Sequence, residues 1–229
     1  MGPHGKAFLK LLLGSEVLRF GSFKTKSGRL SPYFFNTGNF KSGQVLAAVA
    51  GIYADVILEK IGDQVDNLFG PAYKGIPLAV MTAHELAKRT GKDVTFTFNR
   101  KEAKDHGEGG TLVGHTYQGH EKTVVIEDVI TGGTSFSETL PILKHYGIRP
   151  IGLIVGVDRQ EKGNAGEVSA YAAIAKTWET KAVSIVTIKD VIAELHNKEF
   201  AGKVWIDDAG FKAAKDYLAT YGAANAYTL

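Results

Sequence analysis

The sequence predicts an α/β fold in which a mostly parallel sheet is flanked by helices. Residues 123–129, 151–159 and 181–188 are apolar at most positions, which is typical of strands buried on both faces of a sheet. Segments with the apolar spacing of helices lie between these strands. Strands and helices that alternate in this way build parallel sheets, and ligands bind such sheets beyond the carboxyl ends of the strands.

The individual elements are expected in a regular order along the chain. Residues 1–16 have an amphipathic helical pattern, and the helices expected at 75–91 and 135–147 each end at a glycine, Gly91 and Gly147. Residues 94–99 alternate as a strand does, whereas the polar residues from 100 to about 118 indicate an irregular segment. Further helices are expected at 44–62, 172–178 and 189–199, and a further short strand at 67–72.

The composition is that of one globular domain. The chain has 229 residues, of which 44% are hydrophobic, and this is enough to bury a sizeable core. No internal repeat or low-complexity linker divides it, so we expect a single domain over residues 1–229. Cysteine is absent, which excludes a disulfide framework, a thiolate metal site and a cysteine nucleophile, and fits a cytoplasmic location.

Neither a membrane nor a nucleic acid is an expected partner. The longest apolar stretch, residues 45–54, is well short of the ~20 residues that cross a bilayer. The formal net charge is +3, and the lysines and arginines are scattered among acids. We assign no chemistry to the tail over residues 201–229.

Two adjacent carboxylates, Glu127 and Asp128, end one of the apolar segments. The sequence continues directly into a Thr-Gly-Gly-Thr-Ser turn and a helix, with Thr134 or Ser135 placed to cap that helix. Glycines let backbone N–H groups converge, and a helix N-terminus adds partial positive charge, so the turn suits a phosphate. The acids would repel a bare anion and need hydroxyls, a metal or developing positive charge. A ribose phosphate meets both requirements, because its phosphate suits the turn and its hydroxyls suit the acids. The alternative is an ordinary turn with solvated acids.

A basic segment lies between residues 99 and 114. Arg100, Lys101, Lys104 and His106 fall within seven positions and are followed by glycines. Cations on a glycine-hinged segment can close over a multiply charged anion such as a diphosphate and exclude water. The alternative is a solvated loop.

Two further segments have the residues of anion sites. In LFGPAYKGIP, the glycines bend the chain between a strand and a helix and present backbone N–H groups at the helix start; a tight turn with a solvated lysine is the alternative. Arg159 follows a buried strand, and its guanidinium matches a carboxylate with two hydrogen bonds. The alternative for Arg159 is an ion pair with Asp158 or Glu161.

In combination, five motifs resemble those of a known family. VVIEDVITGGTS is similar to the motif with which the type I phosphoribosyltransferases bind phosphoribosyl pyrophosphate (PRPP). FKTKSGRLSPYFFNTG, LFGPAYKGIP, FNRKEAKDHGEGG and GVDRQEKG resemble the branch of this family that acts on orotate. The resemblance runs from about residue 20 to residue 190. Many members have aspartate at the position of Glu127, which keeps the charge and shortens the side chain by one methylene.

The resemblance implies a reaction and a homodimer. PRPP and orotate would give orotidine 5′-monophosphate and diphosphate in pyrimidine (UMP) biosynthesis, with Mg²⁺ bound through PRPP and not directly by the protein. The basic segment would be a mobile loop whose Lys104 reaches the active site of the partner subunit. Residues 1–40 would form a small hood, and residues 41–229 the core and the tail.

The resemblance also assigns roles to residues. Lys104, Asp128 and Glu127 would be catalytic. Orotate would contact Phe34, Phe35, Thr131 and Arg159, although aromatic neighbours in a strand are more often core residues. PRPP would contact Lys26, Tyr73, Lys74, Arg100, Lys101, Lys104, His106, Glu127, Asp128, Val129, Ile130, Thr131, Gly132, Gly133, Thr134 and Ser135.

Two other functions remain open at this point. One is a regulator of the same fold that binds PRPP without converting it. The other is a phosphoribosyltransferase that acts on a purine or another base. The combination of a base pocket and a diphosphate loop argues against the regulator. Activity measured with a panel of bases would distinguish an orotate transferase from one that acts on another base.

Overall fold

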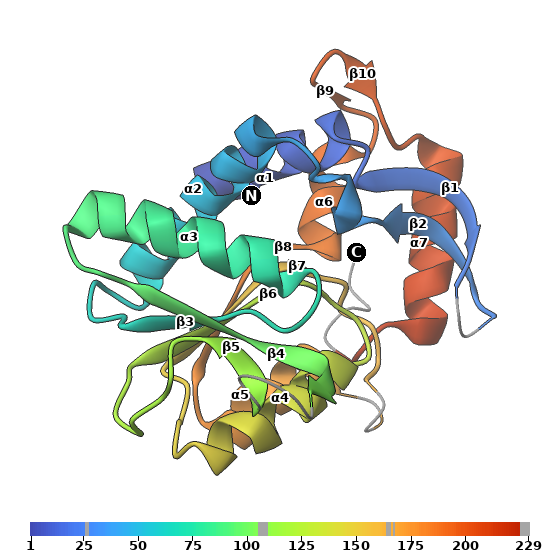
Figure 1. Cartoon of the computed structure of the whole chain (residues 1–229). Helices are drawn as coiled ribbons and strands as arrows, with labels where there is room; N and C mark the ends of the chain where they lie inside the picture. Colours follow the sequence, from blue (N-terminus) through green and yellow to red (C-terminus); the bar gives the residue numbers. More distant parts are fainter. Residues whose placement is uncertain (26–27, 105–109, 164–165, 167, 225–229) are drawn as a thin grey trace.

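A six-stranded sheet forms the centre of the protein (Figure 1). The computed structural model describes residues 1–25, 28–104, 110–163, 166 and 168–224. The strand order is β5-β4-β3-β6-β7-β8. All neighbouring pairs are parallel except β4 and β5. The strands are β3 (Asn67–Phe69), β4 (Thr95–Lys104), β5 (Gly110–Gly114), β6 (Thr123–Ile130), β7 (Gly152–Asp158) and β8 (Lys181–Thr187). The predicted α/β class is confirmed.

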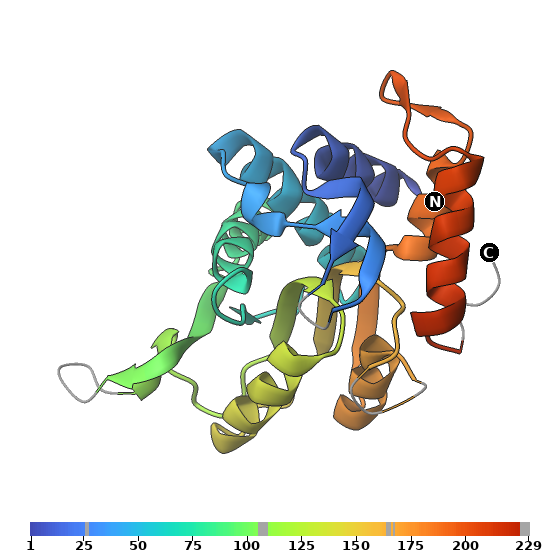
Figure 2. The same ribbon diagram turned by 90° about the vertical axis from the view of Figure 1, so that its right-hand side faces the viewer.

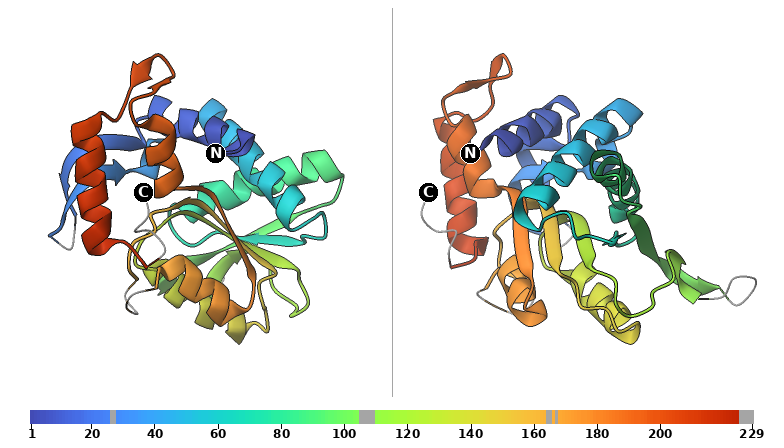
Figure 3. Two further views of the ribbon diagram at one scale, coloured as in Figure 1. Left: turned by 180° about the vertical axis from the view of Figure 1, so that it is seen from behind. Right: turned by 90° about the vertical axis from the view of Figure 1, so that its left-hand side faces the viewer.

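Helices cover both faces of this sheet (Figures 1 and 3). One face packs against α1 (Pro3–Gly14), α2 (Gly43–Lys60), α3 (Gly75–Thr90) and α6 (Ile188–Leu195), and the other against α4 (Thr134–His145) and α5 (Ala170–Trp178). Every residue of β7 is buried, as expected for a central strand between two helical layers. Within the described residues, no helix has both the length and the hydropathy that a membrane span requires.

A second, smaller unit lies beside the sheet. The strands β1 (Leu18–Lys24) and β2 (Leu30–Phe35) pair antiparallel and are followed by the short helix η1 (Thr37–Asn39). The helix α7 (Asp208–Tyr221) packs on β2 (Figures 1 and 2). A short ladder of β9 (Glu199–Phe200) and β10 (Lys203–Val204) precedes α7. The hairpin of β1 and β2 and the helix α7, which lie far apart in the sequence, therefore meet on one side of the molecule.

The register of β6 and β7 positions the candidate site. Ile130, the last residue of β6, pairs with Asp158, the last residue of β7. The segments that begin at Thr131 and Arg159 consequently leave the sheet side by side. This is the carboxyl edge at which parallel sheets bind ligands.

Two local predictions are wrong. The polar segment after residue 99 is not irregular throughout, because β4 extends to Lys104 and pairs with β5 in a hairpin that projects from the sheet (Figure 2). A projecting hairpin has little core to face, so its sequence lacks the apolar pattern of a buried strand. Neither Thr134 nor Ser135 caps α4; the cap position is Gly133, with φ +82° and no side-chain cap bond. The predicted glycine ends of α3 and α4 are confirmed, since Gly91 and Gly147 both have φ +71°.

Gly156→Ala is expected to destabilise the fold. A Cβ at this position of β7 would lie 2.6 Å from the carbonyl oxygen of Asp128 and would also meet the hydroxyl of Tyr53. Overpacking of this kind costs about 1–3 kcal/mol, which corresponds to a fall in Tm of roughly 3–10 °C for a protein of this size. Thermal unfolding measures the change. Gly43→Ala is the control, because a Cβ there meets nothing within 4 Å. Equal Tm values for the two variants would contradict the close packing.

Candidate active site

The acidic pair is buried at the carboxyl end of β6. Glu127 and Asp128 are only 5% and 8% exposed, so the alternative of solvated acids is wrong. The hydroxyl of Thr37, from η1, donates a hydrogen bond to Oδ2 of Asp128. The Nζ of Lys74 lies 3.9 Å from the same oxygen, and the hydroxyl of Tyr53 donates to the carbonyl of Glu127 over 2.9 Å. Elements far apart in the sequence thus converge on these two residues.

Burial raises the pKa of Glu127 well above its usual value, and the adjacent Asp128 raises it further. Two hydrogen bonds lower the pKa of Glu127, but they do not offset the effect of burial. One comes from the N–H of Asp128, which lies 3.1 Å from Oε1, and the other from the side chain of Ser135. The ionised form of this carboxyl group is therefore costly in the free protein. Ligand hydroxyls, or positive charge that develops beside it, would stabilise that form.

The Thr-Gly-Gly turn encloses a cavity next to the acids. Its volume is about 200 Å³. The N–H groups of Phe136 and Ser137 both donate to the carbonyl of Gly133, and the N–H groups that precede them at a helix start suit an anion. Gly133 is required here, because a Cβ would lie 2.8 Å from the Cβ of Ala170 and φ is positive. The lining residues are Glu127, Val129, Ile130, Thr131, Gly132, Gly133, Ser135 and Phe136.

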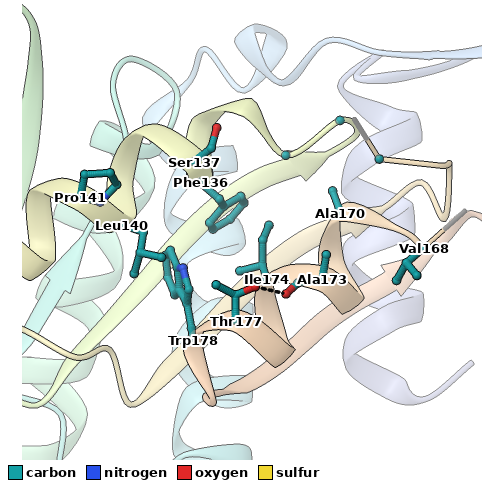
Figure 4. Close-up of a pocket in the computed structure, with 13 residues that line it drawn as sticks. Phe136, Ser137, Leu140, Pro141, Val168, Ala170, Ala173, Ile174, Thr177 and Trp178 are labelled. Carbon is teal, nitrogen blue, oxygen red and sulfur yellow. Dashed lines mark hydrogen bonds between the residues drawn. The ribbon is translucent and has the colours of Figure 1, made fainter. Parts of the chain in front are cut away.

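A second cavity, of about 350 Å³, lies between α4 and α5 (Figure 4). It shares Gly132, Gly133 and Phe136 with the first one. Its walls are largely apolar, and the rings of Phe136 and Trp178 meet edge to face with centroids 5.7 Å apart. Apolar walls cannot replace the hydration of a phosphate. We therefore place the anion site in the smaller cavity, beside the acids.

The projecting hairpin carries the basic residues. Nζ of Lys101 lies 2.8 Å from Oε2 of Glu138 on α4. Nε of Arg100 is buried, and no described residue accepts a hydrogen bond from it. Lys104 ends β4, but its side chain and the whole of His106 lie outside the described residues. The ion pair of Lys101 thus connects the start of the basic segment with α4. Residues 105–109 of this segment lie outside the described residues.

The segment after β3 makes a tight turn beside Asp128. A Cβ on Gly75 would lie 2.8 Å from the carbonyl carbon of Gly70, so the turn requires glycine. The N–H of Ala72 donates to the Asn99 side chain over 2.9 Å. Tyr73 is 69% exposed, and the adjacent Lys74 points toward Asp128. Both side chains are accessible to a ligand at the carboxyl edge.

Phe34 and Phe35 lie on opposite faces of β2, since successive residues of a strand alternate. Phe35 is buried in the core next to Tyr33, as the alternative reading of this segment expected. Phe34 is partly exposed and stacks on Phe23 with centroids 5.4 Å apart. A joint contact of both rings with one base stays a prediction. Lys26 lies outside the described residues.

Arg159 is buried directly after β7 and pairs with Glu161. Oε1 of Glu161 lies 2.8 Å from Nε and 2.6 Å from Nη2. In this structure the arginine thus makes the ion pair that the sequence left open as an alternative. Its guanidinium also lies over the ring of Tyr33, 5.2 Å from the centroid.

Sequence reasoning missed two residues that support the site, Thr37 and Tyr53, and named a third, Glu161, only as the alternative ion-pair partner of Arg159. Thr37 and Tyr53 hold the acidic segment, and Glu161 holds Arg159. Thr37 stands inside one of the motifs, FKTKSGRLSPYFFNTG, so its position was visible although its contact with Asp128 was not. Nothing in the local sequence around Tyr53 distinguishes it from a core residue.

The described residues contain no group of three or more acidic, histidine or cysteine side chains that could hold a metal ion. The carboxylates at the edge are nevertheless oxygen donors, which Mg²⁺ prefers. Any divalent ion at this edge would need further oxygens from a ligand.

Comparison with known proteins decides the family. A profile of the phosphoribosyl transferase domain matches residues 37–189, the part of the chain that contains the acidic pair and the turn. The orotate phosphoribosyltransferase of Salmonella newport (strain SL254) is 46% identical over 198 residues, which cover 86% of this chain and 91% of that protein. The chain belongs to the orotate phosphoribosyltransferase family.

Solved structures agree with this assignment. The orotate phosphoribosyltransferase of Francisella tularensis has a TM-score of 0.77 and 34% identity to this member of the family, and the match covers 94% of this chain and 99% of that one. The Mycobacterium tuberculosis orotate phosphoribosyltransferase in complex with PRPP has a TM-score of 0.58 at 17% identity, covering 83% of this chain and 93% of that one. The second likeness concerns the fold alone.

Asp158 is a buried acid next to Arg159 with no role in the predicted chemistry. Burial raises its pKa to about 6, although the N–H of Gln160 donates to it over 2.8 Å. The folded protein therefore binds this proton more tightly than the unfolded chain, whose value is 3.8. Below about pH 4 both states are protonated. Between about pH 4 and 6 the wild type loses stability as the pH rises.

Asp158→Asn is expected to remove this pH dependence. The free energy of unfolding of the variant, minus that of the wild type, should increase from about pH 4 to about pH 7 by up to about 3 kcal/mol, because one pKa unit corresponds to about 1.4 kcal/mol. Urea unfolding at the two pH values measures it. Asp216→Asn on the exposed side of α7 is the control. A difference that stays constant with pH would contradict the burial of an ionising carboxyl group.

Proposed function

We propose that the protein transfers the 5-phosphoribosyl group of PRPP to orotate and releases diphosphate, forming orotidine 5′-monophosphate in pyrimidine biosynthesis. One observation carries the proposal: a buried carboxylate pair adjoins a glycine turn at a helix N-terminus. This is the arrangement that a ribose 5-phosphate needs. The 46% identity to an orotate phosphoribosyltransferase supports the choice of substrate.

The acids and the turn would bind different parts of the ribose phosphate. The N–H groups of the turn and of the first residues of α4 bind the 5′-phosphate. Glu127 and Asp128 accept hydrogen bonds from the ribose hydroxyls. Cleavage of the anomeric bond develops positive charge on the sugar, as in glycoside hydrolysis, and two carboxylates stabilise this charge. No covalent nucleophile is needed.

The diphosphate would be held from two sides. Tyr73 and Lys74 approach it from the turn after β3, and Arg100, Lys101, Lys104 and His106 from the projecting hairpin. In the proposed homodimer, Lys104 serves the site of the partner subunit. Arg159 binds the carboxylate of orotate on the other side of the ribose, with the segment of residues 1–40 as a hood over the base. A cytoplasmic location is part of the proposal.

Mg²⁺ fits the donor set as a substrate-bound ion. The buried carboxylates supply negative charge at the carboxyl edge, while the described residues offer no complete protein cage. Oxygens of the diphosphate and water would complete the coordination, which is how this ion binds in phosphate-transferring sites. When bound, the ion neutralises charge on the departing diphosphate.

The first test follows the absorbance of orotate after addition of PRPP and Mg²⁺, with wild type and Lys104→Ala at equal concentration. The wild type should consume orotate only when PRPP and the metal are both present, and a chelator should stop the reaction. The variant should be slower by about 10²–10³-fold, because it lacks a cation beside developing charge. Lys212→Ala, an exposed lysine on α7, should behave as wild type.

Each other outcome has a defined meaning. Orotate that stays unchanged while PRPP binds would reject the enzyme in favour of a PRPP-binding regulator. Conversion of a purine or another base in a panel, without conversion of orotate, would reject the base assignment.

The proposed dimer predicts complementation between two inactive variants. Lys104→Ala lacks the loop lysine and Asp128→Asn lacks a ribose contact, so each homodimer is impaired. Random exchange of subunits should restore about a quarter of the wild-type sites, since half of the dimers carry one site with both residues intact. Activity is measured before and after mixing and subunit exchange. Activity that does not rise, although exchange is shown with a tagged subunit, would place Lys104 in the site of its own chain.

A further inference from the structure

Arg159 uses only one edge of its guanidinium in this structure. Oε1 of Glu161 accepts a hydrogen bond from Nε at 2.8 Å and lies 2.6 Å from Nη2 as an ion pair. Nη2 is nevertheless buried, and no described residue accepts a hydrogen bond from it. A guanidinium offers a second pair of parallel N–H groups along its Nη1 and Nη2 edge. A second carboxylate can therefore bind Arg159 while Glu161 stays in place.

Glu161 is itself held tightly. Its side chain is about 2% exposed, and a second cation, Nη1 of Arg29, lies 4.0 Å from Oε2. The hydroxyl of Tyr33 donates to Oε1 over 3.4 Å. A buried carboxylate needs such partners to remain ionised. The pair of Glu161 and Arg159 is consequently a rigid unit rather than a solvated surface contact.

The C-terminal helix supports the same segment through the backbone. The N–H of Lys162 donates to the carbonyl of Tyr221 over 2.9 Å, and the N–H of Ala223 donates to the carbonyl of Gln160 over 2.8 Å. Glu161 and Gly222 thereby form an antiparallel bridge. These bonds fix the backbone on both sides of Glu161.

Aromatic side chains join this bridge to the N-terminal hairpin. The ring of Tyr33 meets that of Tyr217 edge to face at 5.6 Å. The guanidinium of Arg29 lies over the ring of Tyr221, 4.7 Å from its centroid. All four residues lie outside the matched phosphoribosyl transferase domain, which spans residues 37–189. Glu161 itself lies within the matched domain, whereas the aromatic residues that support it come from outside that domain.

We propose that Glu161 is a positioning residue that sets the guanidinium of Arg159 for the carboxylate of the base, with Tyr33 and the turn after α7 as its support. The inference rests on the proposed function, because it assumes that Arg159 binds orotate. Glu161 occupies the Nε and Nη2 edge and directs the other edge to the ligand. Loss of its charge leaves Arg159 free to rotate, which weakens recognition of a carboxylate but not of PRPP.

Glu161→Gln tests this role, because it keeps the size of the side chain and removes the charge. The KM for orotate should rise about tenfold, whereas the KM for PRPP and kcat should change less than about twofold. Glu179→Gln is the matched control, since it breaks an exposed glutamate pair with Arg149 and should change none of these constants. Thermal unfolding of each variant shows whether it is folded.

A competition experiment separates positioning from a general structural effect. Uracil lacks the carboxylate of orotate, so inhibition by uracil should be equal in wild type and Glu161→Gln. Tyr33→Phe removes one hydrogen bond to Glu161 and should raise the KM for orotate about two- to fivefold. This second variant decides the question if Glu161→Gln does not fold.

Three results would overturn the inference. An unchanged or lower KM for orotate in Glu161→Gln would mean that Glu161 is neutral or competes with the base. A parallel loss for orotate, PRPP and uracil would mean that it only supports the fold. No effect of Tyr33→Phe, with Glu161→Gln unfolded, would remove the proposed support. A wild type that does not convert orotate is a separate outcome, and it rejects the proposed function first.

Discussion

The parallel pairing of β6 and β7 is the constraint on which the rest of the site depends. Because Ile130 and Asp158 are partners in this ladder, the phosphate turn and the arginine segment leave the sheet next to each other. A shift of one residue would exchange the faces of the sheet toward which Glu127 and Asp128 point. Gly156 enforces close packing at this point, since its neighbours are Tyr53 and the backbone of Asp128. The residues proposed to contact the phosphate, the ribose and the base thus all follow from the pairing of these two strands.

The central architecture was predictable from local patterns. Strands such as β6 and β7 are buried on both faces, so their apolar residues are continuous, and glycines at the ends of helices have positive φ. The hairpin of β4 and β5 was not predictable in this way, because strands that project from the sheet carry polar residues on both faces. The helix α7 was not predicted either. Its position depends on contacts with β2 and with residues 160–162, which a local sequence pattern does not show.

The parts of the site that are formed by residues adjacent in the sequence could be predicted. The contacts between residues far apart in the sequence could not. Glu127, Asp128 and the glycine turn are adjacent in the sequence, and their combination indicates a ribose phosphate. The hydrogen bond from Thr37 to Asp128 joins residues of separate elements, as does the one from Tyr53 to Glu127. The cap of α4 was mispredicted because hydroxyl residues usually cap helices, whereas close contact with Ala170 demands a glycine here. A pattern cannot show that contact.

The bridge between residues 160–162 and the turn after α7 also bears on how the protein matures during synthesis. The strands that hold the phosphate turn are all made before α7, and domains fold as units while synthesis proceeds from the N-terminus. Tyr221 and Ala223, which pair with Lys162 and Gln160, leave the ribosome late. The residues of the proposed sugar-phosphate pocket are therefore synthesised before those that brace Arg159. In the proposed enzyme, the support for base recognition would be the last part of the site to be completed.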